Sequence, residues 1–132
     1  MQPTTQAAPV SKTKLWTGRI LSGLVVLFLL VDAGMKIMRA QVAVEGTAKL
    51  GYPAGVLVPL GFVLLVCTLL YAIPSTAIWG AVLLTGYLGG AVDAHVRAGD
   101  PLFSHVLFPV YLGVMLWGAL YLRDSRVRAL VS

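Results

Sequence analysis

Four apolar segments, each about twenty residues long, fill most of this chain and decide what it can fold into. The hydrocarbon core of a bilayer is roughly 30 Å thick, so about 20 helical residues cross it once. The composition agrees, because 58% of the residues are hydrophobic and only 11% are charged, against roughly 25% charged in soluble domains. We therefore expect an all-α integral membrane four-helix bundle with up-down-up-down topology and spans at residues 16–38, 54–73, 75–96 and 101–122.

Prolines and glycines mark the boundaries between these spans. Pro74 leaves almost no loop between the second and third spans, which predicts a tight antiparallel hairpin. Asp100 is expected to cap the fourth span, with Pro101 at its first helical position. Residues 1–14 are predicted to be a disordered tail, residues 15–124 the membrane domain, and residues 125–132 a basic C-terminal tail.

The basic residues lie in short polar flanks beside the spans, where they are typical of topology signals. The flanks on the side of the two termini contain Lys12, Lys14, Arg19, Arg123, Arg126 and Arg128, and the opposite flanks contain Lys36, Arg39, Lys49 and Arg97. Because cytoplasmic flanks collect Lys and Arg, this distribution favours cytoplasmic termini. The net charge of +5 is thereby explained without nucleic acid, and the expected partner is the lipid bilayer.

Two pairs of opposite charges lie near the ends of spans. Asp32 and Lys36 are four residues apart in the first span, and Asp93 and Arg97 repeat this spacing in the third. In each pair the acid precedes the base, which is the favourable order for an ion pair on a helix. Since the first and third spans run in the same direction, both pairs should lie at the same, outer end. Ionisable groups in spans are costly, so the pairs are either interfacial ion pairs or parts of a binding or proton-handling site.

Asp93 is expected to face the neighbouring helices and not the lipid. Helical spacing places it on one face with Gly86, Gly90 and Arg97. Small residues four positions apart allow membrane helices to approach closely. This face is therefore predicted to pack inside the bundle.

The fourth span begins at the same outer end. His105 lies about one turn into it, and Pro109 cannot donate a hydrogen bond to the His105 carbonyl. A freed carbonyl at membrane depth needs a partner from protein, water or ligand, so we expect a polar pocket here that the first two spans complete. Tyr87 and Tyr111 lie deeper in their spans, as core aromatics or as a stacking surface for a flat ligand such as a quinone ring.

Several kinds of site find no support in the sequence. Cys67 is the single cysteine, which excludes an intramolecular disulfide and paired-cysteine metal motifs. Asp93 and His95 are turned about 200° apart on a regular helix and cannot bind one ion together. There is no serine-triad order and no glycine-rich phosphate loop. We expect no metal site and no covalently bound cofactor.

Four stretches have a familiar pattern: LVDAGMKIMRAQVAVEGTAKLGYP, LLYAIP, LLTGYLGGAVDAHVRAGDPLF and FPVYLGVMLWGALYLRD. Together they resemble the DoxX-like family of small four-helix bacterial membrane proteins, over roughly Gly18 to Asp124. The residue before Thr76 is often basic in such proteins and is Ser75 here. The resemblance implies a bundle in the bacterial cytoplasmic (inner) membrane. Founding members are subunits linked to quinone and sulfur redox chemistry, others look like accessory proteins, and no family-wide catalytic residues can be carried over.

We therefore expect an accessory or binding membrane protein whose outer-end pocket holds a quinone, lipid or other small hydrophobic molecule in the service of a redox complex. The predicted ligand-binding residues are Asp32, Lys36, Tyr87, Asp93, Arg97, His105 and Tyr111. Two alternatives stay open. One is a quinone-linked oxidoreductase subunit that receives electrons from a partner subunit. The other is a structural or assembly partner of a membrane complex, or a homo-oligomer, that uses the glycine-rich third span.

Overall fold

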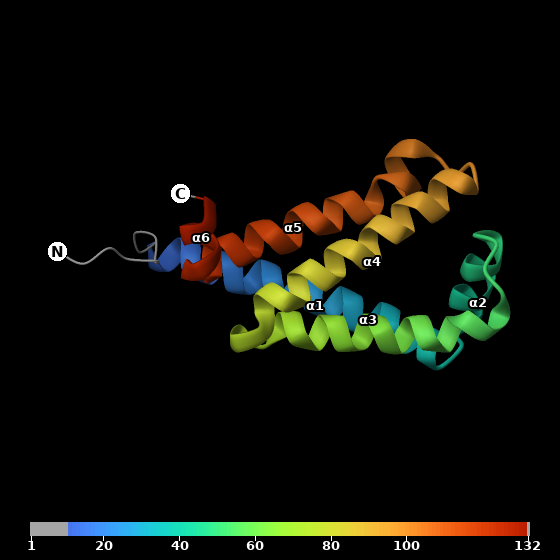
Figure 1. The fold of residues 1–132 in the computed structure, drawn as a ribbon, viewed down its shortest axis with the longest axis horizontal. Coiled ribbons are helices and arrows are strands. Elements are labelled where there is room, and N and C mark those ends of the chain that lie inside the picture. The colour runs from blue at the N-terminus through green and yellow to red at the C-terminus, as the bar shows by residue number, and fades with distance from the viewer. Residues whose placement is uncertain (1–10, 132) are drawn as a thin grey trace.

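The computed structural model describes residues 11–131, which form helices and contain no strand (Figure 1). The predicted all-α class is confirmed for this part of the chain. The α-helices are α1 (Lys12–Ile37), α2 (Gln41–Lys49), α3 (Leu57–Ala72), α4 (Ala77–Arg97), α5 (Phe108–Arg123) and α6 (Ser125–Val131). Short turns of 3-10 helix at Ala54–Val56 and Pro74–Thr76 precede α3 and α4, and a π-helical turn at Leu102–Val106 precedes α5.

The four long helices pack in a closed order. α1 packs along α3 and α5, and α4 packs along the same two helices, so α1 and α4 lie diagonally opposite each other. Figure 1 shows α2 at one end of the molecule and the two chain ends at the other. We call these the α2 end and the terminal end.

The core is made by residues that recur every three or four positions on each helix. On α1 these buried positions are Gly18, Ser22, Val25, Leu29 and Ala33. Leu64 of α3, Leu84 of α4 and Leu116 of α5 meet them with no exposed surface. This spacing is that of one helix face turned inward.

Large apolar side chains also cover the outside of the molecule, among them Ile20, Val66, Trp79 and Val114. In the part of the chain that the structure describes, three helical segments have the length and apolar composition to cross a membrane, namely Lys12–Ile37, Pro74–Arg97 and Leu102–Arg123. α3 is equally apolar but has 16 residues, which is about 24 Å at 1.5 Å per residue. Residues 11–131 are thus all-helical, and three of their helices have the length and apolar composition expected of a membrane protein.

The structure differs from the expected boundaries in three places. Residues 41–49, expected to be part of a polar loop, form α2. Residues 12–14 belong to α1, and residues 1–10 of the expected tail lie outside the described residues. The basic segment after residue 124 forms α6.

The beginning of the fourth span also differs from expectation. Asp100 does not cap a helix with its side chain, since the residue before the π-helical turn is Pro101 and no side-chain cap bond forms there. The N–H groups of Val106 and Leu107 donate to carbonyls five residues back, at Pro101 and Leu102. Gly99, at φ +74°, lets the chain leave α4 before this turn.

The α3–α4 hairpin is the tightest contact between helices. A Cβ added to Gly80 would lie 2.1 Å from the backbone nitrogen of Tyr71 and 2.5 Å from its Cα. No side chain fits in this space, because the neighbouring atoms are backbone. Gly80 therefore fixes how closely α4 approaches the end of α3.

Replacing Gly80 by alanine should destabilise the protein by about 1–3 kcal/mol or more, because the backbones of α3 and α4 must move apart. Gly86→Ala is the matched control on the same helix, since a Cβ there meets no atom within 4 Å and alanine favours the helix. Thermal unfolding in mild detergent, followed by circular dichroism, measures the difference. Equal melting temperatures for the two variants would contradict the assignment of Gly80 as the contact point.

Candidate functional site

The predicted pair of Asp32 and Lys36 is formed on α1, where the Lys36 ammonium contacts the Asp32 carboxylate. The Lys36 side chain is 16% exposed and that of Asp32 is 36% exposed. Lys36 is held against α3, because a Cβ at Gly61 would lie 2.9 Å from Lys36 Cβ. The pair is thus half-buried between helices at the α2 end.

Tyr87 of α4 belongs to the same polar group. Its phenol lies within electrostatic range of Asp32 and of Tyr52, which follows α2. Tyr52 and Tyr87 are thus electrostatic neighbours of the Asp32–Lys36 pair, and no hydrogen bond joins them to it within residues 11–131. Of the predicted site residues, this group contains Asp32, Lys36 and Tyr87.

Asp93 and Arg97 also form their predicted pair, with Arg97 Nε 3.5 Å from Asp93 Oδ2. Their side chains are 71% and 61% exposed, however, so the prediction that Asp93 faces the other helices is wrong. The buried face of α4 consists of Ala77, Gly80, Ala81, Leu84, Leu88 and Ala94. Gly86 and Gly90 are exposed with Asp93, and the two ion pairs do not join in one buried cluster.

A third polar group lies where α4 turns into the fourth span. His95 Nδ1 lies 2.6 Å from Asp100 Oδ2, and the rings of His95 and His105 are 5.8 Å apart between centroids. Ser104 Oγ lies 2.8 Å from His105 Nδ1. Asp100 thus pairs with His95, five residues before it.

The remaining predicted residue, Tyr111, donates its hydroxyl proton to the Phe103 carbonyl at 3.1 Å. It is exposed on α5 and ties that helix to the π-helical turn. Within residues 11–131, no group of three or more His, Cys, Asp or Glu side chains is arranged to hold a metal ion.

An apolar groove of about 400 Å³ runs between α4 and α5. Its lining residues are Thr85, Leu88, Gly89, Val92, Pro109, Val110, Gly113, Val114 and Trp117. Trp117 Nε1 donates to Thr85 Oγ1 at 2.7 Å at the end of the groove farther from the α4–α5 connection. The groove is therefore apolar along its length, and the Trp117–Thr85 hydrogen bond closes the end that lies farther from the α4–α5 connection.

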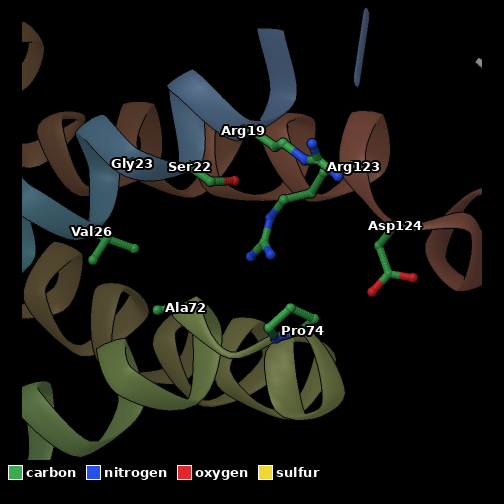
Figure 2. Close-up of a pocket in the computed structure, with 8 residues that line it drawn as sticks. All are labelled: Arg19, Ser22, Gly23, Val26, Ala72, Pro74, Arg123 and Asp124. Carbon is green, nitrogen blue, oxygen red and sulfur yellow. The ribbon is translucent and has the colours of Figure 1, made fainter. Parts of the chain in front are cut away.

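A second cavity of about 430 Å³ lies at the terminal end, where the sequence predicted only topology signals. Figure 2 shows Arg19, Ser22 and Gly23 of α1 on one side, Ala72 and Pro74 on the other, and the Arg123 side chain reaching between them. Arg123 Nη2 donates to the Tyr71 carbonyl at 2.7 Å, and its guanidinium lies 4.8 Å from the centre of the Tyr71 ring. Contacts between residues so far apart in the chain leave no local sequence signal.

Asp124 also lines this cavity, and its charge is satisfied within the chain. Its carboxylate accepts hydrogen bonds from the backbone nitrogen and the guanidinium of Arg126. Partial burial raises the pKa of Asp124, but the hydrogen bonds and charge of Arg126 outweigh this effect and hold the pKa below its usual range. Arg126 Nη2 in turn donates to the Pro74 carbonyl at 2.6 Å, which fastens α6 to the α3–α4 turn.

The lowered pKa predicts an acid-dependent loss of stability. A depressed carboxylate pKa contributes stability above its unfolded value, and this contribution disappears as the pH falls below about 4. Asp124→Asn should therefore lower the melting temperature at pH 7 and should lose less further stability than the wild type on acidification. Glu45→Gln, which removes an exposed carboxylate on α2, is the control for the loss of one negative charge. Parallel acid profiles for wild type and Asp124→Asn would contradict the prediction.

Comparison with known proteins identifies the family. Residues 20–119 match the model of the DoxX-like family. No curated protein and no solved structure matches the chain. The matched region extends from α1 into α5. It therefore includes the groove, the Asp32–Lys36 and Asp93–Arg97 pairs, and the two histidines. Because it covers most of the sequence, this protein belongs to the DoxX-like family.

Proposed function

We propose that this protein is a membrane-embedded binding or accessory protein that holds a small amphiphile in the α4–α5 groove. The first candidate is a quinone with an apolar tail, serving a redox complex whose other subunits supply the electrons. The apolar groove, with polar side chains beyond one end, is the observation that carries this proposal.

The groove has the shape that an apolar chain requires. Its two glycines, Gly89 and Gly113, leave room that larger side chains would fill: a Cβ at Gly89 meets no atom within 4 Å, and one at Gly113 meets only Leu88 Cδ1 at 4.0 Å. Ligand sites are typically apolar clefts of about 300–1,000 Å³ with a few polar groups that fix orientation. Because the groove opens on an apolar outer surface, a ligand can enter it from the bilayer.

Helical spacing leads from the groove to the polar groups at the α2 end. His95 follows the lining residue Val92 by three positions on α4, and Asp93 follows the lining residue Gly89 by four. His105 is hydrogen-bonded to Ser104 through Nδ1, and its Nε2 makes no hydrogen bond within residues 11–131. In the proposed complex, His105 contacts the polar head of the ligand, and the exposed Asp93–Arg97 pair lies beside it.

Asp32, Lys36 and Tyr87 form a separate group that includes no groove-lining residue. Their predicted part in ligand binding remains a prediction, as does that of Tyr111. A role in proton transfer to a quinone would require the ligand head to reach Asp32. Asp32→Asn separates this role from binding in the groove, because it keeps the groove unchanged.

We also propose that all four long helices cross the bacterial cytoplasmic membrane, with both termini in the cytoplasm. The 3-10 turn Ala54–Val56 leads directly into α3. With about 2 Å per residue in the turn and 1.5 Å in the helix, the two together reach about 30 Å. That length matches the hydrocarbon core of a bilayer.

Filling the groove should remove the ligand. In Gly89→Leu the new side chain occupies the groove, so the amount of quinone that copurifies in mild detergent should fall about tenfold, equivalent to about 1.4 kcal/mol of binding free energy. His105→Ala should lower it through loss of the head contact. Native mass spectrometry and extraction of bound quinones measure both effects.

Gly86→Leu is the matched control, since Gly86 is exposed on the same helix and does not line the groove. It should retain the ligand. Unchanged ligand content in Gly89→Leu, or copurification of phospholipid alone, would overturn the assignment of a quinone to the groove. Reduction of a quinone analogue by the isolated protein with a defined donor would replace the binding role by an enzymatic one.

A further inference from the structure

The cavity at the terminal end has a chemistry different from that of the groove. Two guanidinium groups, those of Arg19 and Arg123, line it together with the Ser22 hydroxyl (Figure 2). Val26 and Ala72 form its apolar part. Such a lining suits a ligand with an anionic head and an apolar portion.

The lining of this cavity carries more positive than negative charge. Asp124 is the acidic residue in the lining, and its carboxylate is bound to Arg126. No carboxylate within residues 11–131 lies within 4.0 Å of the guanidinium nitrogens of Arg19 or Arg123. Asp124 lies within electrostatic range of Arg123, but its hydrogen bonds are made to Arg126, so the lining keeps an excess of positive charge.

Arg123 is also held in position without using all its donors. Nη2 is bound to the Tyr71 carbonyl, and the guanidinium lies over the Tyr71 ring. Nε is buried and has no hydrogen-bond partner in the described structure. The hydrogen-bonding capacity of the Arg123 guanidinium is thus not used up within the described residues.

Arg19 adds a second donor group from α1. Its guanidinium lies 5.0 Å from the centre of the Trp16 ring, and no hydrogen bond to protein occupies it among the described residues. Tryptophan near the end of a membrane helix is typical of the membrane–water interface. The cavity thus lies at the depth where lipid head groups are found.

We propose that this cavity binds an anionic phosphate group, and specifically the head group of an anionic phospholipid. The planar donor forks of Arg19 and Arg123 match the geometry of phosphate oxygens. The glycerol and the first carbons of an acyl chain would lie against Val26 and Ala72. A soluble phosphate ester offers the same head-group chemistry without the apolar portion.

The test is a titration of the delipidated full-length protein in detergent, followed by native mass spectrometry. The probes are phosphatidylglycerol, phosphatidylcholine, glycerol 3-phosphate and inorganic phosphate. We expect tight binding of phosphatidylglycerol and at least about tenfold weaker binding of phosphatidylcholine. Arg19→Gln should weaken phosphatidylglycerol binding about tenfold, the loss expected for one charge-assisted contact.

Three further variants make the result specific. Gly23→Leu narrows the cavity and keeps every charge, because a Cβ at Gly23 meets no atom within 4 Å, and it should weaken binding as well. Arg123→Lys keeps the positive charge but loses the paired N–H donors of the planar guanidinium. Circular dichroism checks that this variant folds. Lys14→Gln removes one charge from the same end of α1 outside the cavity and should bind normally.

Equal losses in Lys14→Gln and Arg19→Gln would overturn the proposal, since they would indicate general surface attraction. Equal affinity for the two phospholipids, or normal binding by Gly23→Leu, would overturn it as well. Binding of glycerol 3-phosphate as tight as that of phosphatidylglycerol, with the same dependence on Arg19, would support the phosphate site and assign it to a soluble ester.

Discussion

The buried hydroxyl of Tyr71 is the interaction on which the arrangement of the four long helices depends. Tyr71 has no exposed surface, and its hydroxyl donates to the Leu116 carbonyl of α5 at 2.7 Å. Because the tyrosine proton is used there, Ser22 of α1 is the donor in the second contact, at 3.3 Å. The Tyr71 carbonyl accepts a hydrogen bond from Arg123, and the Tyr71 backbone packs against Gly80. Tyr71 of α3 therefore contacts α1, α4 and α5. In hydrocarbon, where polar groups have no water to bind, such a fully paired hydroxyl fixes register and spacing.

The two ends of the molecule differ in how far apart in the chain their hydrogen-bonded and ion-paired residues are. At the terminal end, polar bonds connect residues 45 to 52 positions apart in the chain. At the α2 end, the ion pairs connect residues four or five positions apart, and apolar packing joins the long helices. The apolar groove between α4 and α5 leads toward the α2 end, and the arginine cavity lies at the terminal end. The two sites are thus separated along one bundle.

The sequence predicted those features that depend on local periodicity. The lengths of the apolar segments gave the long helices, and the spacing of four residues gave the pairs Asp32–Lys36 and Asp93–Arg97. The sequence did not predict the direction of Asp93. Glycines four residues apart indicate that another helix can approach closely, but they do not show which face of α4 packs inside the bundle. The tight approach occurs at Gly80 and Gly61, which stand outside that motif. The hydrogen bonds from Arg123 to Tyr71 and between His95 and Asp100 do not follow a helical repeat. No periodic pattern in the sequence could therefore predict them.

The link between Arg126 and Pro74 has a consequence for the order of assembly. α6 follows α5 in the chain, so its contact with the α3–α4 turn can form only after all four long helices have been synthesised. Within the hairpin itself, the Thr76 hydroxyl donates to the Leu70 carbonyl at 2.8 Å. The contact of α6 with Pro74, a residue that also lines the arginine cavity, is therefore a late step in the folding of the terminal end.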